Sequence, residues 1–290
     1  MMLNQLHKCI LPTFLALFSL PVSAGSQFYG ANIDSAKWRT SGNRLECRLT
    51  QDIPGYGKAM FKHRALQAME FRVSANIYPR KASQAVLFVR PPNWKRFANR
   101  KVLGRVAVNV QKDVIVVPRD WAHRLAFELA EGMETVWTHA DWADGQDLIT
   151  AKVLPLRFVP AWQDFQQCGE NLINYGYNDV RFSSFYFTKN SMRLSATEKA
   201  KLNKLAEYVS LDQDFQHIKI SSYTDSRGLR KINKAVSRKR ANMVKNYLVK
   251  QGVSPKRFVI IAQGEVKPKY NNRTASGRAK NRRVEISLVK

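Results

Sequence analysis

The stretch IKISSYTDS, residues 218–226, decides how the C-terminal part of the 290-residue chain folds. Apolar and polar residues alternate in its first half, which predicts a strand over residues 217–223. Asp225 follows this strand and opens the loop to a helix, which the apolar spacing predicts over residues 233–251, with Gly252 as its C-cap. A strand, an acidic turn and a long helix therefore form the centre of this part.

The segments on either side continue the alternation of strands and helices. An aromatic run predicts a strand over residues 181–187, and Ser195 with Glu198 forms a capping box that opens the next helix. Two further strands are predicted over residues 258–262 and 284–289. The order βαβαββ predicts a two-layer sandwich with both helices on one face of the sheet.

The long helix carries an arginine among its core positions. Arg240 lies on or beside the apolar stripe, with Asn233 and Ser237 on the same side. The stripe consists of Val236, Met243, Val244, Tyr247 and Leu248. A buried guanidinium needs a carboxylate partner, which either the protein or a ligand supplies. Two interpretations stay open: a simple salt bridge between Arg240 and Asp225, or a pair that binds a zwitterion, with the acid on its ammonium and the arginine on its carboxylate.

Several separated motifs follow one another in a fixed order between residues 180 and 290. They are the stretch 218–226, Asn233, Ser237, residues 240–241, residues 264–265, Pro268 and residues 277–285. With these motifs, this part of the chain resembles the OmpA-like peptidoglycan-binding family. Ser222 and Tyr223 depart from the family pattern, which usually has glycine and histidine at these positions. The resemblance implies that peptidoglycan is a partner.

The resemblance also implies roles for individual residues. In the family, an aspartate and an arginine bind the free amino-acid end of diaminopimelate in the peptidoglycan stem peptide. Asp225 and Arg240 occupy those two positions, and Thr224, Asn233 and Arg282 match residues that support the pocket.

The part before residue 171 has a different character. It holds all six tryptophans and, from residue 25, 21 basic and 14 acidic residues, whereas residues 171–290 hold 26 basic and 8 acidic residues. Strands are predicted over residues 44–49, 69–73, 85–89, 105–110, 114–117 and 149–158, and one helix over residues 119–132. We expect an α+β protein with a mainly antiparallel β domain with one helix over residues 25–170 and the OmpA-like domain over residues 171–290.

Residues 1–24 have the pattern of a secretory signal peptide, with Lys8 before a short apolar stretch and small residues before a cut after Ala24. Its removal also removes Cys9 and leaves Cys47 and Cys168. An even number of cysteines in an exported chain suggests a disulfide bond between them, although two buried free thiols remain the alternative.

A second set of motifs lies mostly in the N-terminal part. It comprises residues 45–47, 53–57, 91–94, 141–142 and 165–172, with Tyr175. These motifs resemble the periplasmic T-ring proteins of the sodium-driven polar flagellar motor. The resemblance implies a location in the periplasm and three further partners: basal-body ring proteins, a second T-ring protein and the stator complex. A generic wall tether unrelated to flagella is the alternative.

Other classes of function are disfavoured. The net charge of +26 indicates an anionic partner, but the export signal argues against nucleic acid. The sequence holds no His-Glu-x-x-His, Gly-x-Ser-x-Gly or Cys-x-x-Cys motif, and the histidines after residue 24, namely His63, His123, His139 and His217, are scattered. We therefore expect neither catalytic residues, nor a metal, nor a cofactor.

Overall fold

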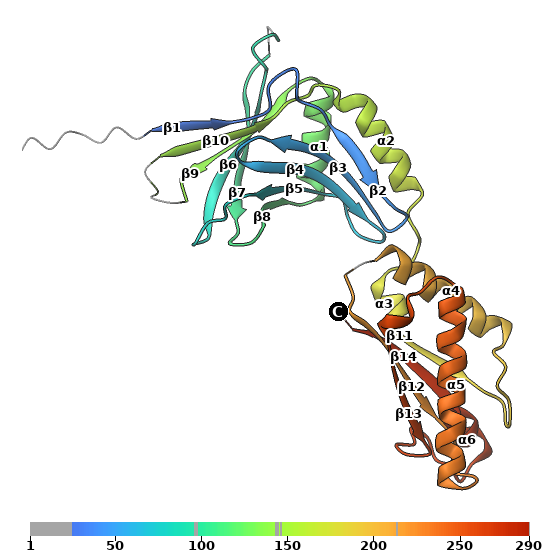
Figure 1. Cartoon of the computed structure of the whole chain (residues 1–290). Helices are drawn as coiled ribbons and strands as arrows, with labels where there is room; N and C mark the ends of the chain where they lie inside the picture. Colours follow the sequence, from blue (N-terminus) through green and yellow to red (C-terminus); the bar gives the residue numbers. More distant parts are fainter. Residues whose placement is uncertain (1–24, 96–97, 143–144, 146, 213, 290) are drawn as a thin grey trace, which may run out of the picture.

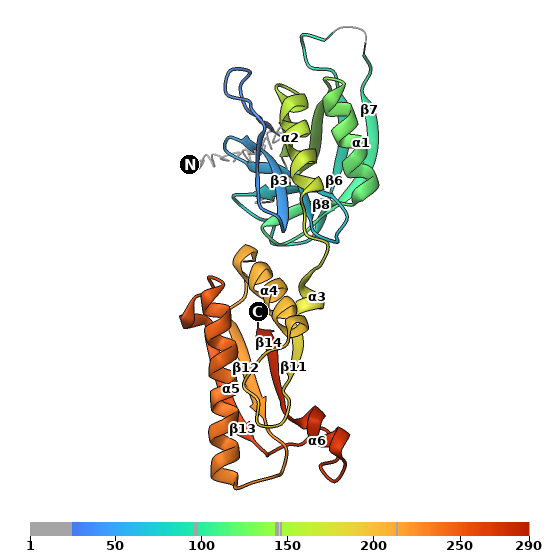
Figure 2. The same ribbon diagram turned by 90° about the vertical axis from the view of Figure 1, so that its right-hand side faces the viewer.

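The computed structural model describes residues 25–95, 98–142, 145, 147–212 and 214–289. The predicted signal peptide over residues 1–24 lies outside them. Figures 1 and 2 show two lobes joined by the segment between α2 (Phe158–Glu170) and α3 (Tyr177–Val180), which confirms the α+β class. Within the described residues, no helix is both long and apolar enough to cross a membrane.

The N-terminal lobe is built from two five-stranded sheets. The first sheet has the order β1 (Ser26–Tyr29), β10 (Leu148–Val153), β9 (Glu134–Ala140), β6 (Ser83–Arg90) and β7 (Lys101–Val108). The second has the order β2 (Arg39–Gly42), β3 (Glu46–Ile53), β4 (Gly57–Arg64), β5 (Glu70–Ala75) and β8 (Asp113–Val117). Neighbouring strands are antiparallel except β1 and β10, so the predicted antiparallel character is confirmed.

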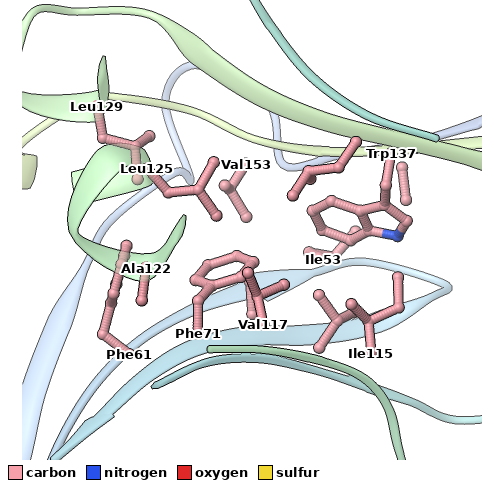
Figure 3. Packing of buried hydrophobic residues seen from close by; sticks show 14 of the residues in the cluster. Ile53, Phe61, Phe71, Ile115, Val117, Ala122, Leu125, Leu129, Trp137 and Val153 are labelled. Atoms are coloured by element: carbon pink, nitrogen blue, oxygen red, sulfur yellow. The ribbon is translucent and has the colours of Figure 1, made fainter. Parts of the chain in front are cut away.

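The two sheets and the two helices of this lobe share one core. Figure 3 shows Phe71 of the second sheet, Leu125 of α1 (Arg119–Ala130) and Trp137 and Val153 of the first sheet pointing toward one another. All four side chains are almost inaccessible to water. Burial of each stabilises the lobe by roughly 1.5–3 kcal/mol before the cost of ordering the chain.

The prediction of a single helix and of a strand that continues to residue 158 is wrong. Strand β10 ends at Val153, and Phe158 begins the second helix, α2. Phe158, Ala161 and Phe165 form its buried face, with helical rather than alternating spacing. Strands β1, β2, β4 and β9 were not predicted either, although the other predicted strands and α1 are present.

The C-terminal lobe has the predicted βαβαββ order of main elements. Its sheet has the order β11 (Phe182–Tyr186), β14 (Arg283–Val289), β12 (His217–Tyr223) and β13 (Phe258–Gly264). The main helices are α4 (Ala196–Leu211) and α5 (Arg230–Lys250), and the short ones are α3, η1 (Pro255–Arg257) and α6 (Ala275–Asn281). Apolar residues of α4 and α5 share one buried cluster with the sheet, which makes two layers. The capping box is also confirmed, because Ser195 Oγ accepts from the Glu198 amide and Glu198 accepts from the Ser195 amide.

The inward face of α5 includes the polar residues that the spacing placed on that side of the helix. Asn233, Ser237 and Arg240 are buried, whereas Val236 is only half-buried. Ser237 Oγ accepts a hydrogen bond from the Gly264 amide at 3.1 Å, which ties α5 to the end of β13. Gly264 has φ +65° and lies so close to α5 that a Cβ there would meet helix backbone. This close approach places the first half of α5 beside the end of the sheet.

The predicted disulfide bond is present. Cys47 of β3 is bonded to Cys168 of α2, with 6.0 Å between the two Cα atoms. The bond joins α2 to the second sheet just before the chain leaves the N-terminal lobe.

Charged side chains connect the two lobes. Arg64 at the end of β4 donates to Asp212 at 2.8 Å and to Glu46 at 3.0 Å, and the Asp212 side chain is only 2% exposed. Leu45 and Ala65 of the N-terminal lobe also pack into the apolar cluster of the C-terminal lobe. The lobes therefore share a small interface with a buried ion pair.

Candidate functional site

A pocket of about 400 Å³ lies at the end of the C-terminal sheet. Four segments line it: the loop after β11, the loop after β12, the first half of α5, and the residue between α6 and β14. All five residues singled out from the sequence line this one pocket, namely Thr224, Asp225, Asn233, Arg240 and Arg282. They come from positions up to 58 residues apart in the chain, so only the fold brings them together.

Asp225 supplies the carboxylate of the pocket. It follows β12, whose ladder continues one step further because the Thr224 amide donates to the Gly264 carbonyl at 2.8 Å. Asp225 Oδ1 accepts from the Arg227 amide at 3.1 Å, and Oδ2 accepts from Arg282 at 2.8 Å. Local backbone geometry and one ion pair therefore hold the carboxylate in place.

Arg240 is a buried cation without a carboxylate partner among the described residues. It is 2% exposed, and its Nε and Nη2 donate only to the Ser191 carbonyl, at 3.4 and 3.2 Å. Its Nη1 has no hydrogen-bond partner in the described part of the chain. The guanidinium lies 5.0 Å from the centre of the Phe187 ring, which adds a weak cation–π contact.

The electrostatics of Arg240 reflect this environment. Burial, followed by repulsion from Arg282, lowers the pKa of Arg240 well below its ordinary value, to about 10, while attraction to Asp225 acts in the opposite direction. The side chain remains charged at neutral pH. A charge held at such a cost is expected where a ligand supplies the missing counter-charge.

Arg282 joins two walls of the pocket. Its Nε donates to the Phe187 carbonyl at 3.1 Å, and its Nη1 forms the ion pair with Asp225. The ion pair of Asp225 is thus with Arg282, and no salt bridge joins Asp225 to Arg240 among the described residues.

The two uncharged residues have different surroundings. Asn233 Nδ2 donates to the Arg227 carbonyl at 3.2 Å and to Glu265 at 2.6 Å, which fixes the loop before α5. Thr224 Oγ1 is buried and has no partner within the described chain. Tyr223, one of the two departures from the family pattern, does not line the pocket, and Arg283 lies 3.9 Å from its ring centre.

Sequence reasoning missed two charged residues that also line the pocket. Lys189 lies in the loop after β11, and Arg227 lies two residues beyond Asp225. The position of Arg227 so close to the acidic turn was an available signal. No such signal pointed to Lys189, because nothing in the sequence places this residue beside α5.

No group of three or more His, Cys, Asp or Glu side chains in the described residues could hold a metal ion. Among the described residues, the pocket presents fixed charges: the carboxylate of Asp225, the guanidinium groups of Arg240 and Arg282, and further cations at the rim.

Comparison with known proteins identifies the family of the C-terminal lobe. A model of the OmpA family matches residues 186–282, the segment that contains the pocket. The peptidoglycan-associated lipoprotein of Pseudomonas aeruginosa is 34% identical over 104 residues, which are 36% of this chain and 61% of that protein. A solved structure of the peptidoglycan-associated lipoprotein from Burkholderia pseudomallei has 30% identity and a TM-score of 0.35, and it covers 36% of this chain and 88% of that chain. The C-terminal lobe is an OmpA-family domain.

The N-terminal lobe identifies the family more narrowly. A model of the MotY N-terminal domain matches residues 29–173, which is half of the chain. The sodium-type flagellar protein MotY of Vibrio parahaemolyticus is 26% identical over 263 residues, which cover 90% of this chain and 89% of that protein. The chain belongs to the MotY family of flagellar proteins.

Proposed function

We propose that the protein binds peptidoglycan by gripping the zwitterionic end of diaminopimelate in the stem peptide. Asp225 accepts hydrogen bonds from the ammonium group, and Arg240 donates to the carboxylate. The observation that carries this proposal is the buried guanidinium of Arg240, which has an unused Nη1 and no carboxylate partner among the described residues. A carboxylate would replace its two long bonds to one carbonyl with shorter, charge-assisted bonds.

The other residues of the pocket support this pair. Arg282 holds the Asp225 carboxylate from the β14 side, and Asn233 orders the loop that carries it. Thr224 adds a buried hydroxyl at the start of that loop. The OmpA family model matches the segment that contains these residues, and a relative named peptidoglycan-associated lipoprotein is 34% identical over 104 residues, which together support the same ligand here.

Long-range charge would assist the binding. Residues 171–290 hold 26 basic and 8 acidic residues, so this domain attracts the anionic wall over distances of the Debye length. That contribution falls as salt rises, whereas the contacts of the buried pair are screened much less.

We further propose that the protein is a periplasmic component of the flagellar T ring. In this proposal, residues 25–170 join basal-body ring proteins and a second T-ring protein, and residues 171–290 hold the wall. The wall-bound protein helps to recruit or anchor sodium-driven stator units by passing their reaction force to a stiff support, without bond-making chemistry. The match of the N-terminal lobe to the MotY family favours this role over a generic wall tether.

Co-sedimentation with purified sacculi tests the wall-binding proposal. The mature chain should pellet with sacculi, and free diaminopimelate should release it. Asp225→Asn should weaken the binding by roughly tenfold or more, because it removes the charge that meets the ammonium. Asp214→Asn is the matched control, since Asp214 is exposed and outside the pocket. Equal binding by the two variants would contradict the assignment.

Motility tests the flagellar proposal separately. A strain that lacks this protein should lose swimming, and the protein should localise at the flagellated pole. Normal swimming in that strain, together with sacculus binding by the protein in vitro, would contradict the flagellar role and favour a generic wall tether.

A further inference from the structure

The pocket contains more positive charge than a zwitterion needs. Among the residues that the structure describes, four cations line it, Lys189, Arg227, Arg240 and Arg282, against the one carboxylate of Asp225. A zwitterion brings one positive and one negative group and so leaves this excess unchanged. The excess indicates a ligand with more carboxylates than ammonium groups.

The four cations differ in whether the protein already supplies a negatively charged partner for them. Arg282 is paired with Asp225 at 2.8 Å, and Arg240 is assigned above to the carboxylate of the zwitterion. Lys189 and Arg227 are exposed, and neither forms an ion pair with any residue that the structure describes. Two positive charges at the rim of the pocket are therefore available to a ligand.

Nearby acidic groups do not cancel these two charges. Glu265 accepts a hydrogen bond from Asn233 at 2.6 Å and does not line the pocket. Other described acidic residues do not line it either. The excess positive charge at the rim is thus a local property, beyond the basic character of the whole domain.

The backbone holds Arg227 at the rim. Its amide donates to Asp225 Oδ1 at 3.1 Å, and its carbonyl accepts from Asn233 Nδ2 at 3.2 Å. Hydrogen bonds with Asp225 and Asn233, two residues of the pocket, therefore fix the backbone of Arg227. From this position its long side chain is available to a group of the ligand outside the zwitterion, as the side chain of Lys189 is from the β11 side.

We infer that Lys189 and Arg227 bind carboxylates of the stem peptide outside the zwitterion, so that the site selects wall peptides with free carboxylates over peptides in which they are amidated. This inference rests on the proposed binding of diaminopimelate. One such carboxylate is that of the glutamate next to diaminopimelate in the peptide. Amidation removes its charge while it keeps the size and shape of the peptide.

Calorimetric titration of the mature chain with two peptides tests this inference. The first is N-acetyl-L-Ala-γ-D-Glu-diaminopimelate with every carboxylate free, and the second is the same peptide with the α-carboxylate of its glutamate amidated. The free peptide should bind about two- to fivefold more tightly, the range for one solvent-exposed ion pair. The double variant Lys189→Gln, Arg227→Gln should bind the two peptides equally.

A control variant removes the same charge elsewhere. Lys201 and Lys219 are exposed on α4 and β12 and do not line the pocket, so Lys201→Gln with Lys219→Gln should keep the preference. Equal affinity of the wild-type chain for both peptides, or a preserved preference in the Lys189/Arg227 variant, would overturn the inference while wall binding stands. Failure to bind either peptide or free diaminopimelate would overturn the proposed function as well.

Discussion

Replacement of Arg240 by methionine tests whether this side chain binds the ligand or stabilises the fold. Burial and the neighbouring Arg282 lower the pKa of Arg240 to about 10, and at about 1.4 kcal/mol for each tenfold change in the proton equilibrium the charge costs roughly 3 kcal/mol to hold there. Methionine avoids that cost and fills most of the same space. It loses the contact with Phe187 and two long bonds to Ser191, together worth about 1–2 kcal/mol. We therefore expect Arg240→Met to leave the free energy of unfolding unchanged or to raise it by up to about 2 kcal/mol.

Two assays on the same variant give the result. Urea denaturation at neutral pH, followed by circular dichroism, measures the free energy of unfolding. Co-sedimentation with sacculi measures wall binding, which we expect to fall by roughly tenfold or more because the carboxylate of the ligand loses its partner. A variant that is equally stable but does not bind the wall marks Arg240 as a ligand residue.

The opposite outcome would refute the reasoning. If Arg240 were half of a buried structural ion pair, its removal would leave an unpaired carboxylate and cost about 3–5 kcal/mol. A loss of that size would mean that the protein itself supplies the counter-charge of Arg240. Unchanged sacculus binding in a well-folded variant would remove Arg240 from the site.

Three other predictions concern the N-terminal lobe and its interface. Substitution of Cys47 and Cys168 by serine should lower the free energy of unfolding by about 2–5 kcal/mol, since the bond closes a loop of 121 residues; equal urea midpoints would contradict this. Burial lowers the pKa of His139 in the folded chain, so near and below the ordinary pKa of 6.5 the unfolded chain binds more protons than the folded chain, and the free energy of unfolding should decrease as the pH decreases. The variant His139→Gln should make the urea midpoint less dependent on pH across that range, and an unchanged pH dependence would contradict this prediction. Arg64→Ala should cost about 3 kcal/mol or more, because it leaves the buried carboxylate of Asp212 without this cation; an effect below about 1 kcal/mol in urea denaturation would show the pair to be unimportant.

The C-terminal lobe was predictable because its local signals agree with one another. The strand over residues 217–223, the capping box at Ser195 and the helix ended by Gly252 each follow from short-range patterns, and the observed β12, α4 and α5 lie close to the predicted bounds. The spacing on α5 also placed Arg240 on the inner side of the helix. Local chemistry and tertiary packing favour the same arrangement there.

The residues at the N-terminus of α2 lack the usual sequence signal for the start of a helix. Its N-cap is Arg157, with φ 58° and no side-chain cap, so the usual serine, threonine, aspartate or asparagine signal is missing. The apolar run from residue 149 continues past the end of β10 and resembles a longer strand. Only Pro160 in the first turn and the helical spacing of Phe158, Ala161 and Phe165 indicated a helix.

The pairing inside the pocket also depends on the tertiary fold. Asp225 and Arg282 are 57 residues apart, and the register of β14 beside β12 brings them together. The sequence predicted Asp225 beside Arg240 and left a direct salt bridge between them open. It could not show that Asp225 would pair with Arg282 and that Arg240 would have no carboxylate partner among the described residues.

A crystal structure of the mature chain soaked with diaminopimelate tests the central claim most directly. We predict that the ammonium group lies within hydrogen-bond distance of Asp225 and that the neighbouring carboxylate accepts from the Nη1 of Arg240, which has no hydrogen-bond partner among the described residues. Diaminopimelate bound elsewhere, or an empty pocket at saturating concentration, would contradict the account.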